Sequence, residues 1–236
     1  MTESAPPLIQ FVDVVKDYGG ARPLRVRALS VGASDRVVIS GLDEAAAETM
    51  VHLISGAALP DEGRVQIAGQ NTRHIETDTE WLLSLDRFGI VTRRAVLLGS
   101  LSVAANLALP LTVSIEPLDL DSSRRVEALA DEVGLARVRL ADTCASLAQT
   151  DLVRLHLARA LALTPELLLL EHPTKDLTDD TARADIGRTL RRISETRPVG
   201  WLAFADDPVF ARHSAGKRWR VDLATGALAR HRWWRS

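Results

Sequence analysis

The sequence has few of the residues that mark several common classes of protein. Among its 236 residues there are one cysteine, Cys144, and one tyrosine, Tyr18. A single cysteine excludes an internal disulfide framework and suits a reducing compartment. No apolar run reaches the roughly 18–20 residues that a membrane-spanning helix needs, and the first residues lack the basic and apolar parts of a secretory signal. We therefore expect a cytoplasmic chain.

The sequence also lacks a strong excess of charge of either sign. Its 29 Lys and Arg and 31 Asp and Glu residues give a formal net charge of −2, which argues against a nucleic-acid partner. A content of 46% hydrophobic and 25% charged residues is typical of a globular protein. The chain is long enough for one sizeable core with a smaller subdomain.

What is present is the outline of a phosphate-binding loop. Arg36–Ser40 is typical of a short buried strand, and a helical, apolar stretch begins soon after Gly41. A Walker A loop has the pattern G-x-x-x-x-G-K-[ST] between a strand and a helix. Gly41 holds the first glycine, but Ala46 replaces the second, Ala47 replaces the lysine, and Glu48 replaces the Ser or Thr.

These replacements change the charge of the loop. It has no lysine and carries the carboxylates of Asp43, Glu44 and Glu48. Two unit charges about 4 Å apart interact by roughly 4 kcal/mol at an effective dielectric constant near 20, so repulsion in place of attraction costs several powers of ten in affinity. Carboxylates at a helix N-terminus also offset the helix dipole. We expect that the chain fills its own anion site.

Further segments follow in a fixed order. They are ISGAALPDEGRVQIAGQ (54–70), FGIVTR (88–93), LSVAANLALPL (101–111), LAQTD (147–151), RLHLARAL (154–161), LLLLEHPT (167–174), LT (177–178) and ADD (205–207). Together with the loop they resemble the ATP-binding subunits of ABC transporters from about Ile9 to Leu228. The segments stand where that family has its Q-loop, signature, Walker B, D-loop and H-loop, and LSVAANLALPL is similar to the macrolide-exporter and lipoprotein-release branch.

The pattern of strands and helices agrees with the fold that the resemblance implies. Continuous apolar strands alternating with helices predict a mainly parallel core sheet of α/β type. Alternating strands at 8–14 and 24–31 would form the antiparallel β lobe of the P-loop NTPase (ABC ATPase) fold. A helix capped at 121–123 would belong to a helical signature subdomain. We predict a single cassette over residues 1–236, in which about 89–165 holds the Q-loop and this subdomain, and a closing hairpin at 219–228.

The resemblance implies vestigial nucleotide contacts at four positions. Tyr18 stands at the aromatic that stacks on adenine, Gly41 and Thr49 belong to the Walker A segment, and Arg93 replaces the Q-loop glutamine. Arg93 would either contact phosphate or, as we favour, pair with an acid such as Glu48.

The catalytic positions are altered as well. Glu171 replaces the Walker B Asp, His172 the catalytic Glu, and Asp206 the H-loop His. His172 would be a poorer base in this role, or simply a surface-facing ring at the end of a strand. Glu171 and Asp206 are the other acids with which Arg93 would pair. We expect no metal and no catalytic residue here, only vestigial ones.

The signature segment is altered in a different way. LSGGQ uses small residues so that backbone amides can approach the γ-phosphate held by the opposite subunit. Here Gln149 and Thr150 bring side chains to the glycine positions, and Asp151 brings a charge. Both faces that the chain would contribute to a dimer of cassettes are therefore altered.

Three functions remain open from the sequence. The first is a cassette that has lost ATP binding and hydrolysis and serves as a structural or regulatory subunit. It would lie on the inner face of the plasma membrane, beside an integral-membrane permease and a possible second, active cassette, and would need no cofactor. The second is a divergent ATPase that uses ATP and Mg²⁺, with Glu171 for the metal and Arg93 for phosphate. The third is a stand-alone binding module. The 106–111 region and Trp81–Leu83 are candidates either for the permease groove or for core.

Overall fold

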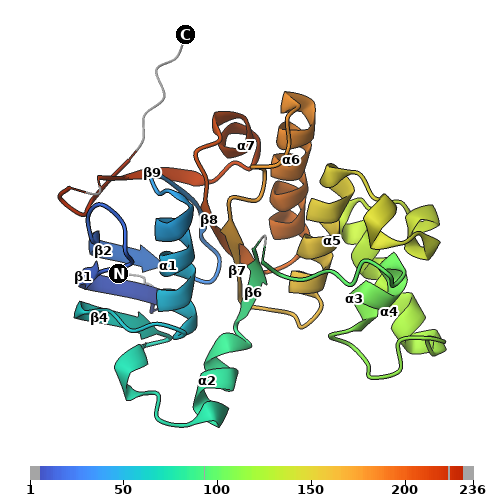
Figure 1. Cartoon of the computed structure of the whole chain (residues 1–236), viewed down its shortest axis with the longest axis horizontal. Coiled ribbons are helices and arrows are strands. Elements are labelled where there is room, and N and C mark those ends of the chain that lie inside the picture. The colour runs from blue at the N-terminus through green and yellow to red at the C-terminus, as the bar shows by residue number, and fades with distance from the viewer. Residues whose placement is uncertain (1–5, 93, 223, 231–236) are drawn as a thin grey trace, which may run out of the picture.

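The computed structural model describes residues 6–92, 94–222 and 224–230, which form two β-sheets and a group of helices (Figure 1). The smaller sheet is antiparallel, with the strand order β2-β1-β4-β5. Its strands are β1 (Ile9–Lys16), β2 (Leu24–Val31), β4 (Glu62–Ile67) and β5 (Gln70–Asn71). The predicted antiparallel lobe is therefore present.

The larger sheet has six strands in the order β10-β9-β3-β8-β7-β6. They are β3 (Arg36–Ser40), β6 (Phe88–Val91), β7 (Leu167–Glu171), β8 (Gly200–Phe204), β9 (Lys217–Asp222) and β10 (Ala227–Arg230). Every neighbouring pair is parallel except β9 and β10, which form the closing hairpin. The prediction of a mainly parallel core sheet is confirmed.

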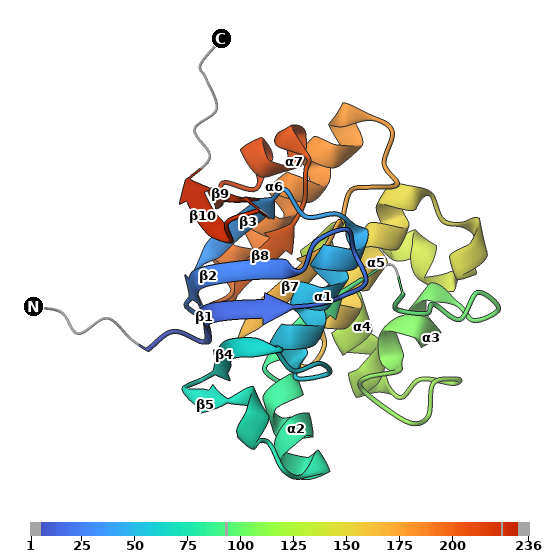
Figure 2. The same ribbon diagram turned by 60° about the vertical axis from the view of Figure 1, so that its left-hand side comes forward.

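The helices lie on both sides of this sheet (Figures 1 and 2). They are α1 (Glu44–Ser55), α2 (Asp78–Leu85), α3 (Val103–Ala108), α4 (Leu120–Val133), α5 (Gln149–Leu161), α6 (Asp180–Thr196) and α7 (Pro208–His213). The predicted cap of α4 at 121–123 is wrong by a few residues. Asp119 is the N-cap, and its Oδ1 accepts the Ser122 N–H at 2.8 Å, because an Asp side chain reaches the amide three residues ahead.

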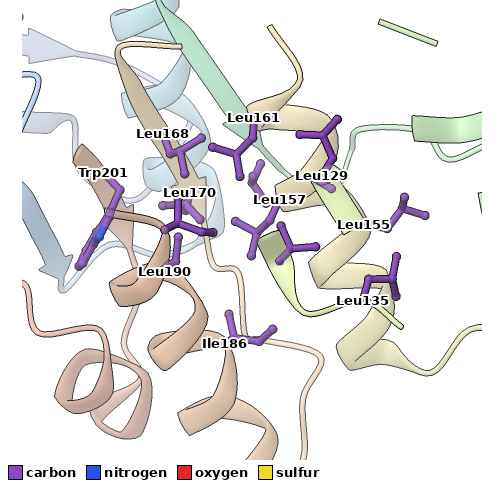
Figure 3. Close-up of a cluster of buried hydrophobic side chains, with 14 of the residues drawn as sticks. Leu129, Leu135, Leu155, Leu157, Leu161, Leu168, Leu170, Ile186, Leu190 and Trp201 are labelled. Carbon is purple, nitrogen blue, oxygen red and sulfur yellow. The ribbon is translucent and has the colours of Figure 1, made fainter. Parts of the chain in front are cut away.

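Successive residues of each central strand face opposite sides of the sheet. In β7, Leu168 and Leu170 pack with α4, α5 and α6, as Figure 3 shows, together with Trp201 of β8. Leu167 and Leu169 instead pack with α1 and the antiparallel sheet. All four leucines are fully buried, because both faces of a central parallel strand are covered.

The parallel arrangement gathers the ends of three central strands at one edge. β3 pairs with β8 through Ile39 and Phe204, and β7 pairs with β8 through Glu171 and Phe204. Gly41, His172 and Asp206 follow these strands within two residues. The edge outside the carboxyl ends of parallel strands is where α/β proteins commonly bind ligands, so this edge is the first place to look for a site.

Candidate functional site

The N-terminus of α1 is occupied by carboxylates of the chain itself. Asp43 is the N-cap, and its Oδ1 accepts the backbone N–H of Ala46 at 2.8 Å. The backbone N–H of Gly41, at the start of the same loop, donates to Oδ1 of Asp206 at 2.8 Å. Two amides of the predicted anion site therefore already bind negatively charged groups.

Gly41 is needed for this turn. Its φ is 90°, in the left-handed region that side chains other than glycine seldom adopt, and an added Cβ would lie 2.7 Å from the carbonyl oxygen of Val221. Thr49 is buried in α1, and its hydroxyl donates to the Ala45 carbonyl at 2.7 Å, one turn back in the same helix. The structure thus brings Gly41 to the site, while the Thr49 hydroxyl bonds within α1.

Two alanines lie under the loop. Ala46 and Ala47 have 0% exposure and pack into the cluster that also contains Met50 and Ile39. At these positions the family pattern has the second glycine and the lysine. The side chains here add apolar contacts to the core and bring no positive charge to the loop.

Arg94 brings a positive charge to the edge of the sheet. One amino group of its guanidinium donates to Oε1 and Oε2 of Glu171 at 2.8 and 3.0 Å, and the other forms an ion pair with Glu48. The Thr92 hydroxyl donates to Oε2 of Glu171 at 2.8 Å. Burial opposes the charged form of Arg94, but hydrogen bonds and the charges of Glu48 and Glu171 outweigh it, and the pKa of Arg94 is raised above its usual value.

The predicted pairing of Arg93 lies outside the described residues. Among the described residues, Glu48 and Glu171 pair with Arg94, and Asp206 binds the Gly41 amide. Sequence reasoning missed Arg94, because only Arg93 was matched to the Q-loop position; the second arginine of the pair at 93–94 was the available signal.

An open cavity of about 680 Å³ lies beside the loop, lined by Asp43, Glu44, His172, Lys175 and Asp206 among others. Lys175, a cation that lines this cavity, forms an ion pair with Glu44 of the loop. His172 adopts a φ of 43°, and its Nε2 is buried with no hydrogen-bond partner among the described residues. The interpretation of His172 as a surface-facing ring is therefore wrong.

Comparison with known proteins now decides the family. The family model described as "ABC transporter" matches residues 24–175. The chain belongs to the ABC transporter ATP-binding family. It is 29% identical over 184 residues to the lipoprotein-releasing system ATP-binding protein LolD of Pseudomonas syringae pv. tomato, covering 78% of this chain and 80% of that one. This agrees with the resemblance to the lipoprotein-release branch.

Other members show the same relationship. The methionine import ATP-binding protein MetN 2 of Paraburkholderia xenovorans is 31% identical over 200 residues, covering 82% of this chain and 50% of that protein. An ATP-binding cassette in a dimeric post-hydrolysis state with ADP and Pi superposes with a TM-score of 0.74 and 22% identity, over 96% of this chain and 100% of the other. That structural likeness confirms the predicted ABC ATPase fold.

Tyr18, at the family's adenine-stacking position, lies close to the loop of this cassette. It is half-buried, and burial first, then the negative charge of Asp43, raise its pKa above the usual value. The structure therefore brings Tyr18, Gly41, Glu171, His172 and Asp206 to one edge of the core.

The signature segment forms the start of α5. Ala148 is the N-cap and makes no side-chain cap hydrogen bond within the described part of the chain. Gln149 is exposed, while Asp151 is held by Arg154, whose Nη1 lies 2.7 Å from its Oδ1 and whose Nη2 pairs with Asp185 of α6. The acid expected here is therefore paired with an arginine one turn along α5, and that arginine links α5 to α6.

The residues predicted either for a permease groove or for core lie in two different places. A groove of about 380 Å³ between β6 and α5 is lined by Leu109 and Pro110, together with His156 and Arg159. Burial first, then the charge of Arg159, lower the pKa of His156, so Arg159 is the cation of the groove near neutral pH. Trp81 instead donates its indole N–H to the Ser55 carbonyl at 2.9 Å, which attaches α2 to the end of α1.

Among the described residues, no helix combines the length and apolar content that crossing a bilayer requires.

Proposed function

We propose that this chain is an ABC cassette that has lost ATP binding and hydrolysis and works as a structural or regulatory subunit of a transporter. It would lie on the cytoplasmic face of the membrane through an integral-membrane permease. A second, active cassette would be its partner in a heterodimer and would supply the hydrolysis.

One observation carries this proposal: the amides that would bind phosphate are taken by Asp43 and Asp206. A working P-loop offers backbone N–H groups, a lysine for the β- and γ-phosphates, and a hydroxyl for Mg²⁺. Here the amides of Gly41 and Ala46 donate to carboxylates. Ala47, at the position of the lysine, contributes only a buried methyl group. These residues do not fit a nucleoside triphosphate, because each would place negative charge, or no charge, against its phosphates.

The metal position argues in the same direction. The alternative of a divergent ATPase needs Glu171 free to hold Mg²⁺, but Glu171 accepts three hydrogen bonds from Arg94 and Thr92. Glu48, at the Ser/Thr position, is paired with the same arginine. Releasing a buried carboxylate from its cation costs several kcal/mol, which ATP binding would have to supply in addition to overcoming the repulsion.

An equilibrium titration with Mg-ATP tests the proposal. We expect no heat of binding from the unaltered chain at millimolar nucleotide. A variant with Ala46→Gly, Ala47→Lys and Glu48→Ser restores the loop pattern, and a second variant adds Asp43→Ser and Asp206→His to free the two amides. Binding should be stronger in the second variant, because only there are both carboxylates gone. Micromolar binding by the unaltered chain would refute the proposal.

A matched control separates site chemistry from added charge. Ala136→Lys introduces the same residue at an exposed position that precedes a short 3-10 turn, away from the loop. It should leave nucleotide binding absent. Binding equal to that of the restored variants would mean that the measurement reports nonspecific attraction of ATP to an added lysine.

The two relatives differ in cargo and in direction, since one is a lipoprotein-releasing protein and the other a methionine-import protein. The subunit role predicts that deletion of this chain impairs transport even though the ATPase activity of the partner cassette persists.

A further inference from the structure

Three parts of the chain that are distant in sequence meet at the guanidinium of Arg94. Glu48 lies in the second turn of α1, Glu171 ends β7, and Arg94 with Thr92 lies just after β6. The distances are 2.8 and 3.0 Å from Nη2 of Arg94 to the two oxygens of Glu171, and Nη1 pairs with Glu48. One cation therefore bridges two carboxylates of the core.

The bridge runs from a buried carboxylate to the surface of the protein. The Glu171 side chain is 7% exposed, compared with 30% for Glu48 and 50% for Arg94. Both oxygens of the buried carboxylate are satisfied, one by Arg94 alone and one by Arg94 and Thr92. Without the arginine, a buried negative charge would face a second carboxylate, and no other residue in the described part of the chain forms an ion pair with both.

Glu48 stands at the position of the P-loop Ser or Thr, and Glu171 stands at the position of the Walker B acid. In P-loop NTPases these two positions together hold a divalent metal ion. We propose that the guanidinium of Arg94 replaces that metal ion structurally. It links α1, β7 and the start of the segment after β6 when neither metal nor nucleotide is bound. A guanidinium suits this work because it is always charged and presents a planar fork of donors to two carboxylates at once.

The segment that follows Arg94 is fixed at its far end as well. Nη1 of Arg159 in α5 donates to the Val96 carbonyl at 2.8 Å. The buried Asn106 of α3 accepts the Leu98 N–H at 2.9 Å and donates to the Leu98 carbonyl at 3.0 Å. The link between the core sheet and the helical subdomain is thus held at Arg94 on one side and by α3 and α5 on the other. Arg94 would keep the two parts in one arrangement at all times.

This inference rests on the proposed function in one respect, namely that no Mg-ATP occupies the position. Its test uses no nucleotide. Thermal unfolding is followed for the unaltered chain and for Arg94→Ala, first in a chelator and then with about 10 mM MgCl₂ or MnCl₂. We expect Arg94→Ala to lose about 5–10 °C of Tm in the chelator, because a buried carboxylate loses its partner.

Added metal should then restore part of the loss in the variant alone. If a divalent ion binds Glu48 and Glu171 with a Kd of about 1 mM, Arg94→Ala should regain about 3–5 °C, since binding to the folded state raises the Tm. The unaltered chain should show no comparable gain. Arg94→Ala combined with Glu171→Gln should lose the metal response, because one of the two carboxylates is gone. An equal metal response in the unaltered chain, or none in Arg94→Ala, would overturn the inference.

Arg137→Ala is the matched control. Arg137 also bridges two carboxylates, Glu127 and Asp131, but all three side chains are between 40% and 56% exposed. Its loss should cost about 2 °C or less and create no metal response, because exposed ion pairs contribute little. A loss as large as that of Arg94→Ala would show that the effect is general to arginine removal.

Hydrogen exchange gives an independent measurement in case Arg94→Ala does not fold. In the milder Arg94→Gln, exchange in residues 92–101 should rise by about tenfold, while β7 and β8 keep their protection. Unchanged exchange in 92–101 would refute the linking role. Micromolar Mg-ATP binding by the unaltered chain would instead refute the proposed function, so the two failures are distinguishable.

Discussion

The N-termini of α1 and α5 differ in whether a side chain caps the helix. Both helices begin at segments that face phosphate in the family, the Walker A loop and the signature. At α1 the N-cap is Asp43, whose carboxylate accepts the Ala46 amide, and Asp206 accepts the Gly41 amide. At α5 the N-cap is Ala148, which offers no side-chain acceptor within the described residues.

Under the proposed function, the difference indicates how nucleotide contact would have been lost at each end. At α1 the anion site is filled by anions of the chain, so restoring it requires their removal. At α5 the small residues are gone, but Asp151 is turned away onto Arg154, and no side chain of the described residues caps the helix. At the first end carboxylates accept hydrogen bonds from the loop amides, whereas at the second only side-chain bulk is added.

Three substitutions test the difference between the N-termini of α1 and α5, and Asp43→Ala should change stability the most. Losing an N-cap costs about 1–2 kcal/mol, which corresponds to about 2–8 °C of Tm for a chain of this size. The freed amides should also attract anions, so sulfate should raise the Tm of Asp43→Ala by more than it raises that of the unaltered chain. Scanning fluorimetry in chloride and sulfate at equal ionic strength measures both effects. An equal response to sulfate would show that Asp43 does not block an anion site.

Asp206→Ala should have a smaller effect on stability. Asp206 is exposed and makes a charge-assisted bond to the Gly41 amide, so its removal should cost about 1 kcal/mol. Asp206→Asn keeps an oxygen that can accept this bond and should recover most of the loss. Urea unfolding of the three proteins gives the comparison. If Asp206→Asn were as unstable as Asp206→Ala, the contact with Gly41 would not be what Asp206 contributes.

Ala148→Ser should have the smallest effect, and it should be stabilising. The backbone of Ala148 is extended, with φ −66° and ψ 154°, which is the conformation that an N-cap serine adopts. A new cap on α5 should add about 0.5–1 kcal/mol and make its N-terminus resemble that of α1. Chemical denaturation tests this. Ala145→Ser, at an exposed position just before the segment, is the control, and its free energy of unfolding should change little. A loss of stability in Ala148→Ser would mean that this end of α5 is already capped by other means.

Most of the fold was predictable because its signals are local. The alternation in 24–31 and the apolar run at 167–170 specify strands of two kinds, half-buried and fully buried, and the structure contains both. The spacing of Val126, Leu129, Ala130 and Val133 predicts the buried face of α4, and all four are buried. The cap of α4 was misplaced by two residues because several Asp and Ser residues lie close together there.

The candidate site was predictable to the level of residue types. The absence of a lysine and the excess of carboxylates in the loop follow from the sequence, and so does the placement of Gly41, Glu171 and Asp206 at one edge of a parallel sheet. What each carboxylate contacts did not follow. The bond from the Gly41 amide to Asp206, for example, has no signal in the sequence.

The sequence by itself determined the family, the order of the strands and helices, and the sign of the charge at the phosphate loop, because these depend on spacing and composition along the chain. Only the tertiary structure decided that Asp206 reaches across to Gly41 and that Arg94 joins Glu48 to Glu171. The physical reason is that these contacts join residues up to 165 positions apart. The direction of each side chain is set by packing of the whole sheet and its helices, and no local pattern records it.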